Sequence, residues 1–131
     1  MSGTHDAVVM AVAFSSDGKL LATASEDKTA RIVKVDGGRE LARVKHDGWV
    51  SAVAFSPDGK LLAIASYDNT ERIWRGADGH ELVRVSHDGA VNALVFSPHS
   101  KLLATASRDK TARIVAGRMA MSSPTTIGSG Q

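Results

Sequence analysis

Short apolar runs alternate with turn-forming residues along the chain. In the middle of the sequence the runs are 50–55, 60–66, 71–75 and 81–85, and each is typical of a β-strand. The residues between them are rich in Gly, Pro, Asp and Asn, which favour tight turns. Such residues interrupt every run before it reaches the length of an ordinary helix. The pattern therefore predicts an all-β fold of short antiparallel strands.

The predicted strands differ in how their polar residues are spaced. The first two strands of a group are apolar almost throughout, as in 11–14 and 61–65, which is typical of strands covered on both faces. The fourth strand alternates, as in 40–44, which fits an outer strand with one wet face. Each group of four strands is therefore expected to grade from buried inner strands to an exposed outer one.

The whole pattern returns every 41 residues, because Phe14, Phe55 and Phe96 occupy one position of the period. Units 5–33 and 87–115 are identical at 20 of 29 positions, which indicates duplication of one structural unit. The chain then divides into three units, 5–45, 46–86 and 87–121. The last unit is expected to have a weak or missing outer strand. The tail over 122–131 is predicted to be disordered.

The unit resembles the WD40 repeat. Residues 46–60 are similar to the opening of that repeat, and residues 61–74 are similar to its second half. The resemblance covers 5–115, and the period agrees with the usual length of about 40–45 residues. It implies that each unit is one four-stranded blade of a β-propeller, and that the protein is a non-catalytic scaffold for protein partners.

In the WD40 family a hydrogen-bonded chain often links a loop His, a strand Ser, a turn Asp and the Trp of the closing Trp-Asp. That Trp-Asp ending is replaced by Val33-Lys34 in the first unit and by Val115-Ala116 in the third, so shorter networks are expected there. The resemblance places the network at His5, Ser25 and Asp27, at His46, Ser66, Asp68 and Trp74, and at His87, Ser107 and Asp109.

The recurring His-Asp pairs could also act as metal ligands or as acid–base groups. A catalytic site normally brings different residues to one point, whereas these pairs recur in every unit, so bracing of loops is the preferred interpretation. The serines lack the strained elbow of a nucleophile, and the glycines form no phosphate-binding loop. We therefore expect no enzyme activity, no metal and no cofactor.

Composition and charge limit the classes of partner that the protein is expected to bind. The 16 Lys and Arg alternate with 14 Asp and Glu, so the net charge of +2 forms no basic stripe and argues against nucleic-acid binding. The absence of cysteine, of a signal-peptide pattern and of a membrane-spanning run favours a cytoplasmic protein. Trp49 and Tyr67 differ from their counterparts in the other units, and with Arg72 they are the candidate partner-binding residues.

Three blades are too few for a propeller, which has at least about four. An open row would expose apolar faces, and a head-to-tail contact between identical chains closes a ring when its rotation permits. We therefore expect a homo-oligomer: a dimer with six blades, favoured because such assemblies are commonest, or a trimer with nine. Two alternatives stay open: a lectin-like propeller with one ligand site per blade, and a fragment or design of duplicated blades with no evolved partner.

Overall fold

A computed structural model describes residues 7–75, 80–99, 102–116 and 125–129, which form strands joined by turns. Within those ranges no helix is long and apolar enough to span a lipid bilayer. The strands are β1 (Val9–Phe14), β2 (Leu20–Ser25), β3 (Thr29–Lys34), β4 (Glu40–Lys45), β5 (Val50–Phe55), β6 (Leu61–Ser66), β7 (Thr70–Arg75), β8 (His80–Ser86), β9 (Val91–Phe96), β10 (Leu102–Ser107), β11 (Thr111–Ala116) and β12 (Thr125–Ser129).

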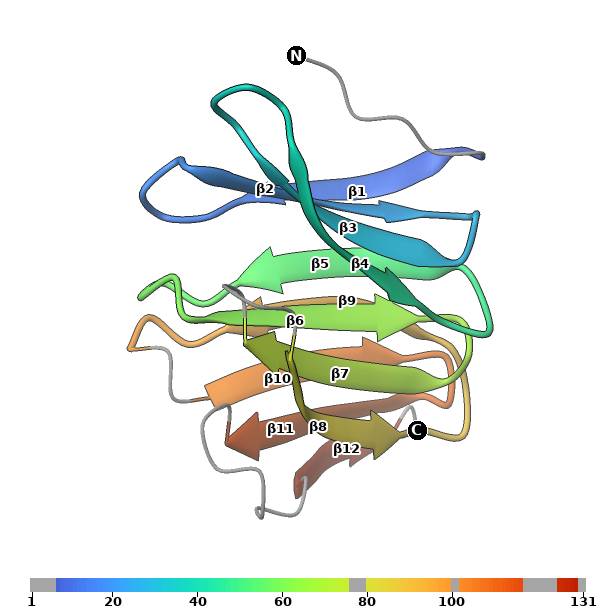
Figure 1. Ribbon diagram of the computed structural model, residues 1–131. Helices are drawn as coiled ribbons and strands as arrows, with labels where there is room; N and C mark the ends of the chain where they lie inside the picture. The colour runs from blue at the N-terminus through green and yellow to red at the C-terminus, as the bar shows by residue number, and fades with distance from the viewer. Residues whose placement is uncertain (1–6, 76–79, 100–101, 117–124, 130–131) are drawn as a thin grey trace.

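The strands form three antiparallel, four-stranded sheets, which confirms the predicted all-β class. The first sheet holds β1–β4, the middle sheet β5–β8 and the third sheet β9–β12, each in chain order. They lie in a row, with the first sheet (blue) at one end and the third (orange to red) at the other (Figure 1). Strand β5 contacts both β1 and β9, so the first strands of the three sheets line one side of the row.

A short hydrogen-bonded turn joins the first two strands of each of the first two sheets. In the middle sheet, Ser56 Oγ donates to Asp58 Oδ1 at 2.6 Å, and the amide of Gly59 donates to the carbonyl of Ser56 at 2.8 Å. Gly59 has a φ of +76°, a conformation that glycine adopts without strain. This turn explains why a Ser-x-Asp-Gly pattern recurs between the apolar runs.

Small residues of one sheet pack against large residues of the next. Ala22 and Ala24 on β2 meet Leu62 and Ile64 on β6, and all four are 0% exposed. The alternate residues of β6 face the other way and pack with Phe96 and others of the third sheet. Every residue of β6 is therefore buried, as predicted for a strand covered on both faces.

The same prediction is wrong for the strands at the two ends of the row. On β1, Val12 is 59% exposed and Phe14 is 62% exposed. At the other end Val95 is 62% exposed and Leu102 is 40% exposed. Among the described residues, each end sheet packs against one other sheet, so part of its apolar surface stays in contact with water.

The end of the chain also departs from the prediction. Within the segment 122–131, which was expected to be disordered, Thr125–Ser129 forms β12 and pairs antiparallel with β11 from Ile114↔Thr125 to Thr111↔Ser129. The pairing supplies hydrogen bonds to an edge that β11 would otherwise expose. The alternative outer strand expected at 118–121 lies outside the described residues.

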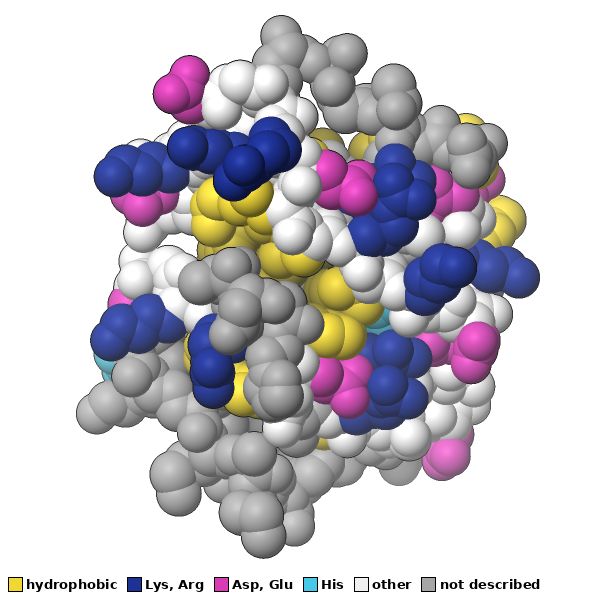
Figure 2. Space-filling model, in the orientation of Figure 1, with side chains coloured by type: hydrophobic (Ala, Val, Ile, Leu, Met, Phe, Trp, Pro, Cys, Tyr) yellow, Lys and Arg dark blue, Asp and Glu magenta, His cyan; other side chains and the backbone are white. Residues whose placement is uncertain are grey.

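Charged side chains cover much of the face formed by the outer strands. Figure 2 shows Lys and Arg beside Asp and Glu around a central strip of hydrophobic side chains. The outer strands carry two local ion pairs: Arg43 bonds Glu40 at 3.1 Å on β4, and Arg84 bonds Glu81 at 3.0 Å on β8. Exposed pairs of this kind contribute about 0–1 kcal/mol each, so they add little to the stability of the fold.

Candidate interaction site

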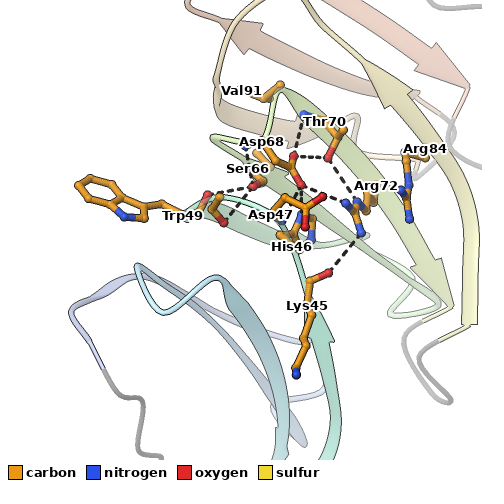
Figure 3. Close-up of polar contacts among 12 residues, drawn as sticks. Lys45, His46, Asp47, Trp49, Ser66, Asp68, Thr70, Arg72, Arg84 and Val91 are labelled. Atoms are coloured by element: carbon orange, nitrogen blue, oxygen red, sulfur yellow. Dashed lines mark hydrogen bonds and ion pairs between the residues drawn. The ribbon is translucent and has the colours of Figure 1, made fainter.

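A buried carboxylate organises the loops at one end of the middle sheet. Asp68, in the turn between β6 and β7, accepts hydrogen bonds from three side chains (Figure 3). The distances are 3.1 Å to His46 Nδ1, 2.5 Å to Thr70 Oγ1 and 3.0 Å to a guanidinium nitrogen of Arg72. The turn between two strands is thus held to the loop that precedes β5.

Backbone contacts complete this attachment. The hydroxyl of Ser66 donates to the carbonyl of Trp49 at 2.9 Å and accepts from the amide of Asp68 at 3.1 Å. The amide of Tyr67 donates to the same Trp49 carbonyl at 2.7 Å, and the amide of Asp47 donates to Asp68 Oδ2 at 3.3 Å. The backbone on both sides of position 48 is therefore fixed by hydrogen bonds.

The ionisation of the pair follows from its burial. Burial lowers the pKa of His46 to about 4, and the nearby charge of Arg72 acts in the same direction. His46 is therefore neutral near pH 7 and carries its proton on Nδ1, which donates to Asp68. Burial acts to raise the pKa of Asp68, but the hydrogen bond from Thr70 and its other contacts outweigh burial and lower it.

The first sheet repeats this arrangement in part. Asp27 accepts from Thr29 Oγ1 at 2.5 Å and from Arg31 at 3.3 Å, and its amide donates to Ser25 Oγ at 3.0 Å. Ser25 Oγ in turn donates to the carbonyl of Val8 at 2.9 Å. The third predicted member of this unit, His5, lies outside the described residues.

In the third sheet, His87 contacts a glutamate instead of the predicted aspartate. Ser107 Oγ donates to the carbonyl of Gly89, and Asp109 accepts from the amide of Asp88 at 3.1 Å, so these residues hold the loop as their counterparts do. However, His87 Nε2 lies 3.3 Å from Glu71 Oε1, and His87 Nδ1 has no hydrogen-bond partner in the described part of the chain. The expected link from His87 to Asp109 is therefore not made.

Two further predicted roles differ from the structure. The indole nitrogen of Trp74 has no hydrogen-bond partner among the described residues, because this side chain packs against the core between the first two sheets. Arg72 was a candidate for binding a partner, but it is 6% exposed and bonds Asp68 and the carbonyl of Lys45. The sequence pattern missed its role in the network because arginine on a strand is usually solvated.

The other two candidate partner-binding residues lie together at the surface. The rings of Trp49 and Tyr67 stack with centroids 5.7 Å apart and planes 24° apart, and Trp49 is 41% exposed. They line a shallow hollow of about 480 Å³ together with Lys28, Gly48 and Arg108. No three His, Cys, Asp or Glu side chains of the described ranges gather as metal ligands do.

Comparison with known families identifies the repeats. The model of the WD40 family (WD domain, G-beta repeat) matches residues 2–34, 38–75 and 80–115, and the chain therefore belongs to the WD40 family. A comparison with curated proteins finds no significant match. WD40 repeat proteins are generally non-catalytic scaffolds for protein–protein interaction. The three four-stranded antiparallel sheets described above are consistent with the blades that WD40 repeats form.

Proposed function

We propose that this chain is a self-assembling scaffold, in which copies join head to tail into a closed propeller that presents its loops to protein partners. The head face consists of outward side chains of β1 and β2, including the exposed Val12 and Phe14 and the partly exposed Leu21, which lies opposite Phe14. The tail face lies at the other end of the row. It consists of Ala93 and Val95 on β9 with Leu102, Ala104 and Ala106 on β10.

The junctions inside the chain show what covers such faces. At the junction of the first two sheets, Val53, Phe55 and Leu62 pack into the cluster that contains Ala22 and Ala24. Val12, Phe14 and Leu21 are the same positions one period earlier, and Ala104 and Ala106 are the same positions as these alanines two periods later. The head face of a second copy therefore carries the side chains that a tail face of this shape accepts.

The exposed area provides the driving force. Contiguous apolar patches above about 300–600 Å² are uncommon on soluble monomers and mark sites of association. Val12 and Phe14 are each about 60% exposed, although their counterparts Val53 and Phe96 are below 10%. Val95, at the other end of the row, is 62% exposed. Burial stabilises by about 25 cal/mol per Å² before the entropic cost of association. The contrast between equivalent positions is the observation that carries the proposal.

A scaffold is favoured over a lectin-like propeller because the exposed aromatic pair is not repeated. The positions equivalent to Trp49 are Val8 and Ala90, and those equivalent to Tyr67 are Glu26 and Arg108. A ligand site in every blade needs the same side chains in every blade. Among the described residues, a stacked aromatic pair occurs in the middle blade alone.

Two variants, each with a charged side chain on one of the two faces, test the head-to-tail contact. Phe14→Asp places a charge on the head face, and Ala104→Arg places a long charged side chain on the tail face. We expect each variant alone to be monomeric and their mixture to form only a one-to-one pair, since one intact head and one intact tail remain. A head-to-head contact would let Ala104→Arg assemble alone, and that result would overturn the proposal.

A further inference from the structure

We propose that the hollow between the loops binds an acidic peptide segment that carries an aromatic side chain. This rests on the scaffold role proposed above and names the chemistry of the partner, but it does not require ring closure. All five lining residues belong to one chain, and they come from four connections: Lys28 between β2 and β3, Gly48 and Trp49 between β4 and β5, Tyr67 between β6 and β7, and Arg108 between β10 and β11.

The stacked aromatic pair forms the floor for an apolar anchor. Trp49 is 41% exposed even though its ring packs on Tyr67. In Figure 3 the indole of Trp49 points away from the hydrogen bonds around Asp68. Trp and Tyr supply large contact area with few rotatable bonds, and with Arg they are the residues that dominate binding energy at interfaces.

Arg108 gives this floor a positive edge. Its guanidinium carbon lies 4.9 Å from the centre of the Tyr67 ring, and a guanidinium nitrogen donates to the Tyr67 hydroxyl at 3.2 Å. Arg31, Arg43, Arg72 and Arg84 each form an ion pair with a carboxylate, whereas Arg108 forms none with the described residues. The Arg108 guanidinium is positioned by the Tyr67 ring, and it can form an ion pair with a carboxylate of a ligand.

Lys28 supplies a second cation from the neighbouring blade. It is exposed, has a φ of 72° at the tip of its turn, and makes no ion pair within the described ranges. The aromatic pair is thus flanked by cations from the first and third sheets. A segment with an aromatic side chain between carboxylates matches this order of groups.

The position of Trp49 is set before any ligand arrives. A side chain at Gly48 would put its Cβ 2.8 Å from the amide nitrogen of Asp68 and 2.9 Å from the carbonyl carbon of Tyr67. Glycine therefore lets the loop lie directly on the turn, where Ser66 and Tyr67 bond the Trp49 carbonyl. A surface that is already ordered loses less conformational entropy on binding.

The charge pattern favours a peptide over a nucleic acid. Asp47 and Asp88 are exposed in the loops before and after the middle sheet, and they interrupt the continuous basic track that a chain of phosphates needs. Nucleic-acid binding relies on many neutralised phosphates along a basic groove. Two cations around an aromatic pair match a few carboxylates at fixed positions.

Panning a random-peptide display library against the full chain tests this inference, with Trp49→Ala as the counter-selection target. We expect enriched sequences in which Asp or Glu flank Phe, Tyr or Trp. Enrichment of basic sequences, or equal enrichment on Trp49→Ala, would overturn the proposal. An absence of any enrichment would overturn it as well.

Tryptophan fluorescence then measures the affinity of one enriched peptide. Trp74→Val leaves Trp49 as the remaining tryptophan and matches Val33 and Val115 in the other units. We expect Arg108→Glu and Lys28→Glu each to weaken binding at least about tenfold, as loss of a central ion pair does. Arg43→Glu is the matched control, because Arg43 is exposed but lies outside the hollow, and it should change the affinity less than about twofold.

The remaining outcomes separate this inference from self-assembly. The head-blocked Phe14→Asp should bind the peptide as tightly as the unmodified chain, because the hollow lies within one chain. If the unmodified chain binds the peptide but stays monomeric, the proposed self-assembly is contradicted and this inference stands. Tighter binding of single-stranded poly-dT than of the acidic peptide would contradict this inference.

Discussion

Phe14 and Phe96 occupy the same position of the repeat, yet Phe14 is 62% exposed and Phe96 is 9% exposed. Phe96 packs on the face of the middle sheet, with Ala63 and Ile73 among its neighbours. Phe14 faces outward from the first sheet, and no other sheet of the described residues packs on that side. The two residues therefore present equivalent surfaces with and without a covering sheet, and in the proposed assembly a second chain would cover Phe14.

Phe14→Ser should weaken self-association at least about tenfold, because the aromatic ring is central to the head face. The dissociation constant from sedimentation equilibrium measures the effect. Leu41→Ser is a control of similar chemistry: Leu41 is 39% exposed on outer strand β4, and its equivalent Leu82 packs at the face already covered inside the chain. An equal effect of both substitutions would indicate general loss of apolar surface and would contradict a specific head face.

Stability should fall as the pH decreases from about 6.5 towards 4, because of His46. Burial lowers the pKa of this residue from 6.5 to about 4 in the folded protein, so in that window the unfolded chain binds a proton that the folded chain does not. The free energy of unfolding is unaffected by His46 protonation well above pH 6.5, and at pH 4 it should be lower by up to about 3 kcal/mol.

Urea unfolding of the unmodified chain and of His46→Gln across this window isolates that contribution. The two proteins differ only at position 46, so the difference between the two curves belongs to His46. The free energy of unfolding of the unmodified chain, relative to that of His46→Gln, should decrease as the pH falls. A difference that stays constant with pH would show that His46 is accessible to solvent in the folded protein.

The contact between His87 and Glu71 should show a large coupling energy. His87 Nε2 and Glu71 Oε1 are 3.3 Å apart with side chains 0% and 1% exposed, so removing one leaves the other buried without that partner. We expect a double-mutant cycle of Glu71→Ala and His87→Ala, measured by urea unfolding, to give a coupling of about 1–3 kcal/mol. Additive effects of the two substitutions would show that the contact stabilises nothing.

Gly48→Ala should destabilise the fold by about 1–3 kcal/mol, because its Cβ would clash with backbone atoms of Tyr67 and Asp68. It should also shift the emission of Trp49 in the Trp74→Val background. Gly89→Ala makes the equivalent clash, 2.8 Å from the amide of Asp109, and serves as the control. It should cost similar stability and leave the emission unchanged. A shift in both variants would show that the effect on Trp49 is indirect.

The period and the turn residues predicted the strands of the middle sheet to within a residue at most ends. The prediction 50–55 matches β5, and 60–66, 71–75 and 81–85 match β6, β7 and β8 closely. Local chemistry determines these boundaries, since a Gly with positive φ or an Asp that accepts from its own turn stops a strand. Strand β12 was missed because its polar composition carries little signal until β11 offers an edge for pairing.

The site was predictable where a local motif or the repeat pattern of the family defines it. The Ser66–Asp68 contact spans two residues, and the structure brings His46 to Asp68 as the family pattern implies. Glu71 was missed because its counterparts are Ala30 and Ala112, although a carboxylate at a position that is otherwise small is itself a signal. The position of Arg108 over Tyr67 depends on the packing of two blades, which no single repeat encodes.

Native mass spectrometry of the unmodified chain at micromolar concentration tests self-assembly most directly. One chain has a mass of 13.8 kDa. The account predicts a single closed species of two or three chains, with no larger open series, because a head-to-tail contact in a ring uses every face. A species of 13.8 kDa under these conditions would contradict it.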